Sequence, residues 1–322
     1  MLPGSEGGQV MRVDAREGMR SRRSILGLAG GVLVTGMNNG SALNALKRTA
    51  PLISGLSLTA YSLKRHMKWW LGKLARGGGT MEMVDFLEYC AELGLEAAEI
   101  TGYFFPEPLD KAAIHAVKRR AHLLGLDLSG GAMGNNFAHA PATAEGRRHL
   151  DHARMWIDRF AEMGTPVVRV FATRGIPRGL SDAQVISHVT ANLEEALVHA
   201  EKRGVILGLE NHDFVSNIDY LLEILGRIDS KWLGVIWDSA NLTAVADPYK
   251  ELARIAPYAV TAQLKVMTKV NGKDVPADYT RLVKILSEAN YRGYLVLEYE
   301  EDEDPYDAIP QELAKLRKIA RD

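Results

Sequence analysis

Short apolar runs alternate with longer amphipathic segments along most of the chain, from Pro51 onward. Each run has the length and the β-branched content of a buried strand, and the segments between the runs carry apolar residues at helical spacing. The predicted strands are residues 52–60, 97–101, 127–133, 167–172, 205–211, 233–238, 260–266 and 294–299. The predicted helices are residues 81–93, 110–124, 142–163, 181–203, 216–227, 248–256, 277–289 and 309–321.

Glycine follows many of these helical segments, at Gly94, Gly125, Gly164 and Gly204. Glycine relieves the left-handed strain at a helix C-terminus, so these residues support the predicted helix ends. Eight strand-then-helix units predict a (β/α)8 TIM barrel, formed as a single domain by residues 46–322. A doubly wound sheet is the alternative, but no Gly-rich phosphate turn follows the first predicted strand.

The first 45 residues have the pattern of a targeting segment rather than of a fold. Arg22 and Arg23 precede an apolar, Gly-rich run at 27–37, and small residues follow up to Ala42. This order is typical of a signal peptide, and the paired arginines resemble the twin-arginine export motif. We therefore expect an exported, periplasmic protein whose residues 1–45 are removed or disordered. A disordered basic leader is the alternative; the run is too short to span a membrane.

The composition of the chain excludes several classes of function. The 322 residues are 47% apolar and carry a net charge of -1, so no basic excess exists to bind nucleic acid. A single cysteine excludes both a disulfide framework and a cysteine-based zinc site. These numbers leave open whether the protein forms a homo-oligomer.

Four successive predicted strands, the fifth to the eighth, end in oxygen-bearing side chains: Glu210, Asp238, Gln263 and Glu298. Active sites of TIM barrels form at the carboxyl ends of the strands, and neighbouring strands lie about 4.8 Å apart. Three carboxylates brought together there would repel one another unless a cation lay among them. We therefore predict a divalent metal site. Helix N-caps and a solvated acidic loop are the alternative interpretations of these residues.

The sequences around these strand ends resemble the xylose isomerase-like TIM-barrel superfamily, in its sugar phosphate isomerase/epimerase and ketose 3-epimerase branch. The resemblance covers about residues 52–321 and depends on the segments Leu207-Gly208-Leu209-Glu210-Asn211-His212, Gly234-Val235-Ile236-Trp237-Asp238-Ser239-Ala240-Asn241, Gln263-Leu264-Lys265 and Gly293-Tyr294-Leu295-Val296-Leu297-Glu298-Tyr299.

The resemblance implies that Glu210, Asp238, Gln263 and Glu298 ligate the metal. The family usually has His at the third position, and no histidine follows His212 in this chain. Glutamine can ligate through its carbonyl oxygen, and an all-oxygen shell favours hard ions. We therefore expect Mn²⁺, with Mg²⁺ or Co²⁺ as alternatives.

The resemblance also implies the chemistry. One of two catalytic carboxylates, Glu210 and Glu298, removes the proton beside a carbonyl to give an enediolate, and the other returns a proton to the opposite face. Lys265 would stabilise the developing oxyanion. A structural ion pair of Lys265 with Glu298 or Asp238 is the alternative.

Four further residues are candidates for contacts with a small carbohydrate substrate. His212 follows Glu210 by two positions, and Asn241 follows Asp238 by three. Trp69 belongs to a candidate aromatic lid after the first strand. Arg169, on the fourth predicted strand, is expected either to bind an anionic group of the substrate or to form an ion pair inside the barrel.

Three other functions compete with a sugar isomerase or epimerase. A lyase that eliminates the aglycone of a 3-keto-glycoside would use the same enolate chemistry on this scaffold. An exported, non-catalytic sugar-binding protein would explain Gln263, although binding alone does not require two opposed bases. A repair endonuclease of the endonuclease IV type would need several more histidines and a basic face, and the sequence has neither.

Overall fold

The computed structural model describes residues 45–321. The predicted signal segment therefore lies outside the described residues, apart from Ala45, and its export and removal stay predictions. Among the described residues, no helix is both long and apolar enough to cross a membrane.

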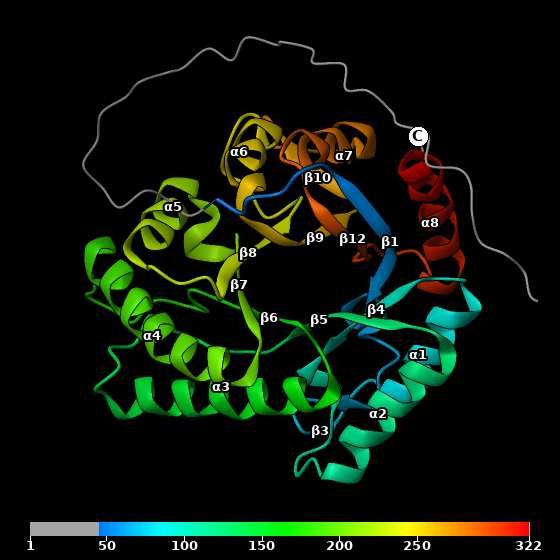
Figure 1. The fold of residues 1–322 in the computed structure, drawn as a ribbon, viewed down its shortest axis with the longest axis horizontal. Helices are drawn as coiled ribbons and strands as arrows, with labels where there is room; N and C mark the ends of the chain where they lie inside the picture. Colours follow the sequence, from blue (N-terminus) through cyan, green and yellow to red (C-terminus); the bar gives the residue numbers. More distant parts are fainter. Residues whose placement is uncertain (1–44, 322) are drawn as a thin grey trace, which may run out of the picture. The chain divides into compact units, whose positions relative to one another are not determined.

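Eight parallel strands close into a barrel in the order β1-β12-β9-β8-β7-β6-β5-β4 (Figure 1). Each strand forms hydrogen bonds with the strands before and after it in this order. The barrel closes because β1 pairs with both β12 and β4. The strands are β1 (Leu52–Thr59), β4 (Ala97–Thr101), β5 (Asp127–Ala132), β6 (Val167–Val170), β7 (Ile206–Glu210), β8 (Leu233–Asp238), β9 (Ala259–Lys265) and β12 (Arg292–Glu298). The predicted TIM barrel is confirmed.

The described residues form eight α-helices, and these surround the barrel (Figure 1). They are α1 (Met83–Glu92), α2 (Lys111–Leu124), α3 (Ala144–Met163), α4 (Asp182–Arg203), α5 (Ile218–Arg227), α6 (Pro248–Ile255), α7 (Tyr279–Glu288) and α8 (Pro305–Arg321). Two hairpins not predicted from the sequence extend the loops after β1 and β9. One joins β2 (Trp69–Trp70) to β3 (Lys73–Leu74), and the other joins β10 (Met267–Val270) to β11 (Lys273–Pro276).

Local signals in the sequence explain where α4 begins and ends. Ser181 and Gln184 form a capping box, in which each side chain accepts a hydrogen bond from the other residue's backbone N–H. At the other end, Gly204 takes a left-handed conformation with φ of 69° and closes the helix. The helix therefore delivers the chain to β7 at a defined point, and β7 carries Glu210.

Alternation along β8 fixes the direction of Asp238. The preceding residue, Trp237, is fully buried and donates a hydrogen bond from its indole Nε1 to the carbonyl oxygen of Leu252 on α6, at 2.9 Å. The Trp237 side chain thus faces the surrounding helices. Because successive side chains on a strand point to opposite faces, Asp238 points into the barrel.

Candidate active site

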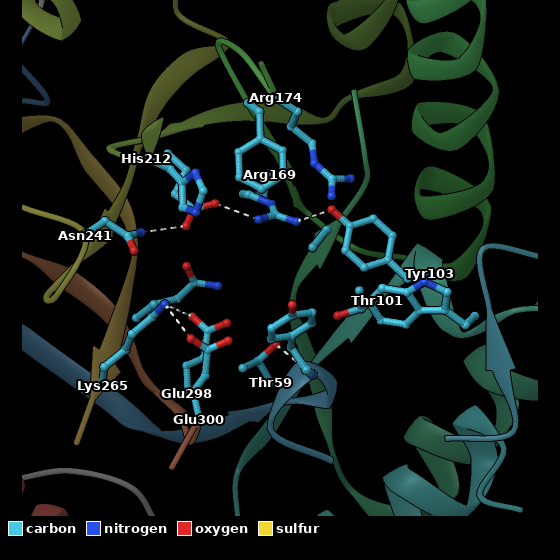
Figure 2. Close-up of a pocket in the computed structure, with 16 residues that line it drawn as sticks. Thr59, Thr101, Tyr103, Arg169, Arg174, His212, Asn241, Lys265, Glu298 and Glu300 are labelled. Atoms are coloured by element: carbon cyan, nitrogen blue, oxygen red, sulfur yellow. Dashed lines mark hydrogen bonds and ion pairs between the residues drawn. The ribbon is translucent and has the colours of Figure 1, made fainter. Parts of the chain in front are cut away.

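One polar pocket opens at the carboxyl ends of the strands, with a volume of about 260 Å³ (Figure 2). It brings together most of the residues predicted from the sequence. The predicted residues that line it are Arg169, Glu210, His212, Asn241, Gln263, Lys265 and Glu298. Asp238 is fully buried beside them, in contact with Lys265.

Both oxygens of Glu210 are held by neighbouring side chains. Arg169 donates to Glu210 Oε2 at 2.6 Å, and Asn241 donates to Oε1 at 3.0 Å. Burial alone would raise the pKa of Glu210, but the Arg169 guanidinium, with smaller contributions from His212 and Lys265, brings that pKa below its usual value. Glu210 is therefore a carboxylate, kept charged and fixed in orientation by its partners.

Three buried side-chain oxygens among the described residues of this region have no hydrogen-bond partner: Thr101 Oγ1, Asp238 Oδ2, which lies 3.5 Å from Lys265 Nζ, and Gln263 Oε1. Asp238 and Gln263 are paired residues on the neighbouring strands β8 and β9. The other oxygen of Asp238 accepts a hydrogen bond from the backbone N–H of Ala240 at 2.8 Å. Unsatisfied buried oxygens are rare in folded proteins, so a pair of them on adjacent strands indicates a ligand position.

Glu99, which the sequence analysis missed, orients Gln263. The Gln263 amide nitrogen donates to Glu99 Oε1 at 2.6 Å, which leaves the carbonyl oxygen of the same amide for another partner. Glu99 is buried at 2% exposure on β4. Burial raises the pKa of Glu99 to about 7, although the hydrogen bond from Gln263 opposes the shift. In the sequence, the only sign that Glu99 could orient a ligand was its position as the one acidic residue in the predicted strand 97–101.

Lys265 lies among three carboxylates. Its Nζ atom is 3.1 Å from Glu300 Oε2, 3.5 Å from Asp238 Oδ2 and 3.8 Å from Glu298 Oε2. Burial would lower the pKa of Lys265, but these carboxylates raise it well above its usual value. We call Glu210, Asp238, Glu298 and Glu300 the rim carboxylates.

The pKa values of the rim carboxylates are shifted in different directions. Burial raises the pKa of Glu298 well above its usual value, and Lys265 only partly opposes this effect. Burial also raises the pKa of Asp238. By contrast, Lys265 and Lys64 hold the pKa of Glu300 low against its burial. Without a further cation, Glu298 is therefore the rim carboxylate most ready to carry a proton.

The aromatic wall of the pocket comes from Trp70 rather than from its neighbour. Trp70 lines the pocket and packs against Tyr61, Tyr103 and Phe104, with ring centroids 5.8 to 6.5 Å apart. Trp69, the residue selected from the sequence, does not line this pocket. The two side chains alternate along β2, so only one of them can face the pocket.

The donor set fits a hard divalent cation. Asp238 Oδ2 and Gln263 Oε1 accept no hydrogen bond, and Glu298 ends the neighbouring strand β12, where it is paired with Lys265. Carboxylate and amide oxygens suit Mg²⁺ and Mn²⁺. Glu210, Asp238 and Glu298 do not bring three ligand atoms within 4.8 Å of one another. In residues 45–321 only His139, Glu145 and His149 do so, around the start of α3.

Comparison with known proteins gives the family. A family model described as xylose isomerase-like TIM barrel matches residues 87–319. The chain belongs to this family. The resemblance seen in the sequence is thereby confirmed.

One curated protein and two solved structures are similar to this chain. The chain is 26% identical over 207 residues to a 3-oxo-isoapionate decarboxylase of Pectobacterium atrosepticum, with 64% of this chain and 68% of the relative covered. The 3-keto-D-glucoside 4-epimerase of E. coli is 19% identical, with a TM-score of 0.61 over 78% of this chain and 99% of that one. A Mycobacterium smegmatis protein of the same fold, in complex with magnesium, is 15% identical, with a TM-score of 0.61 over 84% and 97%. At these identities the two solved structures show the shared fold.

Proposed function

We propose that the protein is a divalent-metal-dependent isomerase or epimerase that moves a proton beside the carbonyl of a free sugar or keto-sugar. The observation that carries this proposal is the pair of buried oxygens that accept no hydrogen bond, Asp238 Oδ2 and Gln263 Oε1, on the two strands between those of Glu210 and Glu298. A sugar-binding protein would not need this arrangement of cation ligands and opposed carboxylates.

The metal would be held by Glu210, Asp238, Gln263 and Glu298. Oxygen donors favour Mn²⁺, with Mg²⁺ or Co²⁺ as alternatives. The magnesium in the Mycobacterium smegmatis protein supports a hard ion on this fold. When bound, such an ion polarises a carbonyl oxygen and stabilises the negative charge that develops on proton removal.

The two glutamates take opposite roles. Glu210, held in orientation by Arg169 and Asn241, is the base that takes the proton from the carbon beside the carbonyl. Glu298 is the carboxyl group that returns a proton to the opposite face of that carbon. Lys265 then donates a hydrogen bond to the oxygen on which charge develops.

The pocket suits a small carbohydrate. Sites for drug-sized ligands enclose roughly 300–1,000 Å³, so a volume of about 260 Å³ corresponds to one sugar unit. Trp70 offers an aromatic face, and His212 and Asn241 offer polar groups to sugar hydroxyls. The names of the decarboxylase and the epimerase above both specify a 3-oxo or 3-keto compound, which supports a keto-sugar.

Metal analysis and isotope exchange test the proposal together. We expect the purified protein to bind one Mn²⁺ in this pocket and to exchange a proton beside the carbonyl of D-fructose or another free ketose with D₂O. Glu210→Gln should abolish the exchange because an amide cannot take up the proton. Glu303→Gln, an exposed Glu-to-Gln change after β12, is the matched control. No metal, or undiminished exchange by Glu210→Gln, would contradict the proposal.

A lyase acting on 3-keto-glycosides is the second candidate, and one observation favours it. Trp70 also lines a second, larger cavity of about 780 Å³ beside the β2–β3 hairpin. This cavity would accommodate an aglycone while the sugar occupies the pocket. Incubation with a 3-keto-glycoside decides between the two reactions: release of the aglycone indicates the lyase, and a change of configuration with the glycosidic bond intact indicates the epimerase.

We further propose that the protein is exported by the twin-arginine route to the periplasm. The order of Arg22 and Arg23, the apolar run at 27–37 and the small residues up to Ala42 supports this proposal. Sequencing the N-terminus of the protein recovered from its host would reveal cleavage after Ala42. Recovery of the intact chain from the cytoplasmic fraction would contradict export.

A further inference from the structure

We propose that the sugar bound in this pocket carries a carboxylate, and that Arg174 and Tyr103 bind that group. The inference depends on the proposed function for the sugar itself and adds the class of sugar. The basic side chains of the pocket differ in whether they have an ion-pair partner. Arg169 is paired with Glu210, and Lys265 is paired with Asp238 and with the last two rim carboxylates. Arg174 lines the same pocket without an ion pair to any residue in 45–321.

Arg174 is exposed, and its guanidinium is flanked by two aromatic rings. The guanidinium lies 5.8 Å from the ring centroid of Tyr103 and 5.7 Å from that of Phe171. The Asn136 side chain donates hydrogen bonds to the carbonyl oxygens of Arg174 and Gly175, at 3.3 and 2.8 Å, and so fixes the loop that follows β6. An arginine supported by two aromatic rings and an anchored backbone loses less freedom when it binds an anion.

Tyr103 presents a second donor next to this guanidinium, as Figure 2 shows. Its hydroxyl oxygen accepts a hydrogen bond from Arg169 at 3.0 Å, so its own proton is left to donate to a ligand. Gly134 leaves room where the two donors meet: a Cβ atom there would lie 3.2 Å from Arg174 Nη1 and 3.5 Å from the Tyr103 hydroxyl oxygen. The donors therefore converge on one small space.

Charge balance favours an anionic ligand. The four rim carboxylates are equalled in number by four basic side chains: Arg169, Arg174 and Lys265, which line the pocket, and Lys64, which pairs with Glu300 from outside its lining. A divalent cation would add two positive charges, and Glu99 removes at most one. The loaded pocket thus retains at least one positive charge, which an anionic substrate neutralises.

A carboxylate matches this subsite better than a phosphate does. Its two oxygens correspond to one guanidinium and one hydroxyl donor, and its single charge corresponds to the single unpaired cation. A phosphate monoester carries a charge of about −1.5 to −2 and three acceptor oxygens. We therefore place the carboxylate of a keto-sugar acid at Arg174, with its carbonyl end toward Gln263 and Lys265.

Three sugars that differ at one carbon test the inference. D-fructuronate, D-fructose and D-fructose 6-phosphate carry a carboxylate, an alcohol and a phosphate at C6. Calorimetric titration of the Mn²⁺-loaded protein should show D-fructuronate binding at least about tenfold more tightly than D-fructose, as a charge-assisted hydrogen bond provides. Arg174→Gln should remove this preference, and Arg174→Lys should keep part of it. Arg178→Gln, in the same loop but outside the pocket, should leave it unchanged.

The outcomes separate this inference from the proposed function. Equal binding of D-fructuronate and D-fructose, a preference that survives Arg174→Gln, or tighter binding of D-fructose 6-phosphate would overturn the carboxylate subsite. A preference that depends on Arg174, in a protein that exchanges no sugar proton with D₂O, would support the subsite and contradict the isomerase or epimerase. Proton exchange without any preference for D-fructuronate would do the reverse.

Discussion

The buried pair between Arg169 and Glu210 offers a sharp test of the site's electrostatics. Their side chains are 11% and 3% exposed, and Arg169 Nη1 lies 2.6 Å from Glu210 Oε2. The substitution Arg169→Met removes the charge but keeps an apolar stem against the ring of Phe171, which lies 3.9 Å from the Arg169 guanidinium carbon in the native protein. It leaves Glu210 buried with Asn241 as its remaining hydrogen-bond partner.

The magnitude follows from the burial. Removing one partner of a buried ion pair costs about 3–5 kcal/mol, because the other charge stays desolvated and unpaired. Arg169 lowers the pKa of Glu210, so the pair stabilises the fold above the usual pKa of glutamate, and this stabilisation disappears as the pH falls through the lowered value. In Arg169→Met, burial dominates and raises the pKa of Glu210. The loss should therefore be largest near pH 8 and smaller near pH 5, where Glu210 takes up a proton.

Urea unfolding in the presence of EDTA, followed by circular dichroism at both pH values, measures the effect without a contribution from bound metal. Glu210→Gln in the Arg169→Met background removes the unpaired charge, so the double variant should regain most of the lost free energy of unfolding. A loss below about 1 kcal/mol, an equal loss at both pH values, or no recovery in the double variant would refute the reasoning.

Three further predictions address other parts of the molecule. Glu99→Ala should weaken Mn²⁺ binding about tenfold or more in calorimetry, because the Gln263 amide loses its anchor; an unchanged affinity would show that Glu99 does not position the ligand. Trp237→Phe should lower the free energy of unfolding by about 1–3 kcal/mol, because the smaller ring leaves space in the core and one of the two hydrogen bonds to the Leu252 carbonyl is lost, while that from the Ala256 N–H remains; a change near zero in urea unfolding would contradict this. Cys90 is fully buried, and burial raises the pKa of its thiol, so it should react with a thiol reagent only after unfolding; rapid reaction of the native protein would disprove this expectation.

The sequence predicted the barrel because each local signal repeats. Eight apolar runs and eight amphipathic segments produce a regular pattern, and glycines such as Gly125, Gly164 and Gly204 take the left-handed conformation expected after their helices. The strand-end residues could also be found, because side-chain alternation and the common carboxyl edge of a parallel barrel place them in one pocket.

The hairpin after β1 could not be predicted in this way. Its strands are two residues long, too short for any periodicity, and their direction depends on the pairing of Trp69 with Leu74 and of Trp70 with Lys73. This register determines which tryptophan faces the pocket. The aromatic residues after β1 predict a lid at this place in the chain, with the contact at Trp69, whereas Trp70 lines the pocket.

The ion-pair partners of residues inside the barrel could not be predicted from local sequence patterns either. Arg169 and Lys265 were each left with two interpretations, a ligand contact or an internal ion pair. The structure shows the ion pairs: Arg169 binds Glu210, and Lys265 lies between Asp238 and Glu300. Which residue meets which across a closed barrel depends on strand order and stagger, neither of which is encoded in a short window of sequence.

The departure from the family pattern at Gln263 becomes understandable once Glu99 is included. A metal-ligating histidine commonly donates its second ring nitrogen to a carboxylate, which fixes the ring and leaves the first nitrogen for the metal. Gln263 reproduces this division: its amide nitrogen donates to Glu99, and its carbonyl oxygen stays without a partner. In the proposed site the division of roles would be the same, with an oxygen in place of a nitrogen as the ligand atom. Because oxygen ligands favour harder ions, this change would alter which metal the site prefers while keeping its place in the barrel.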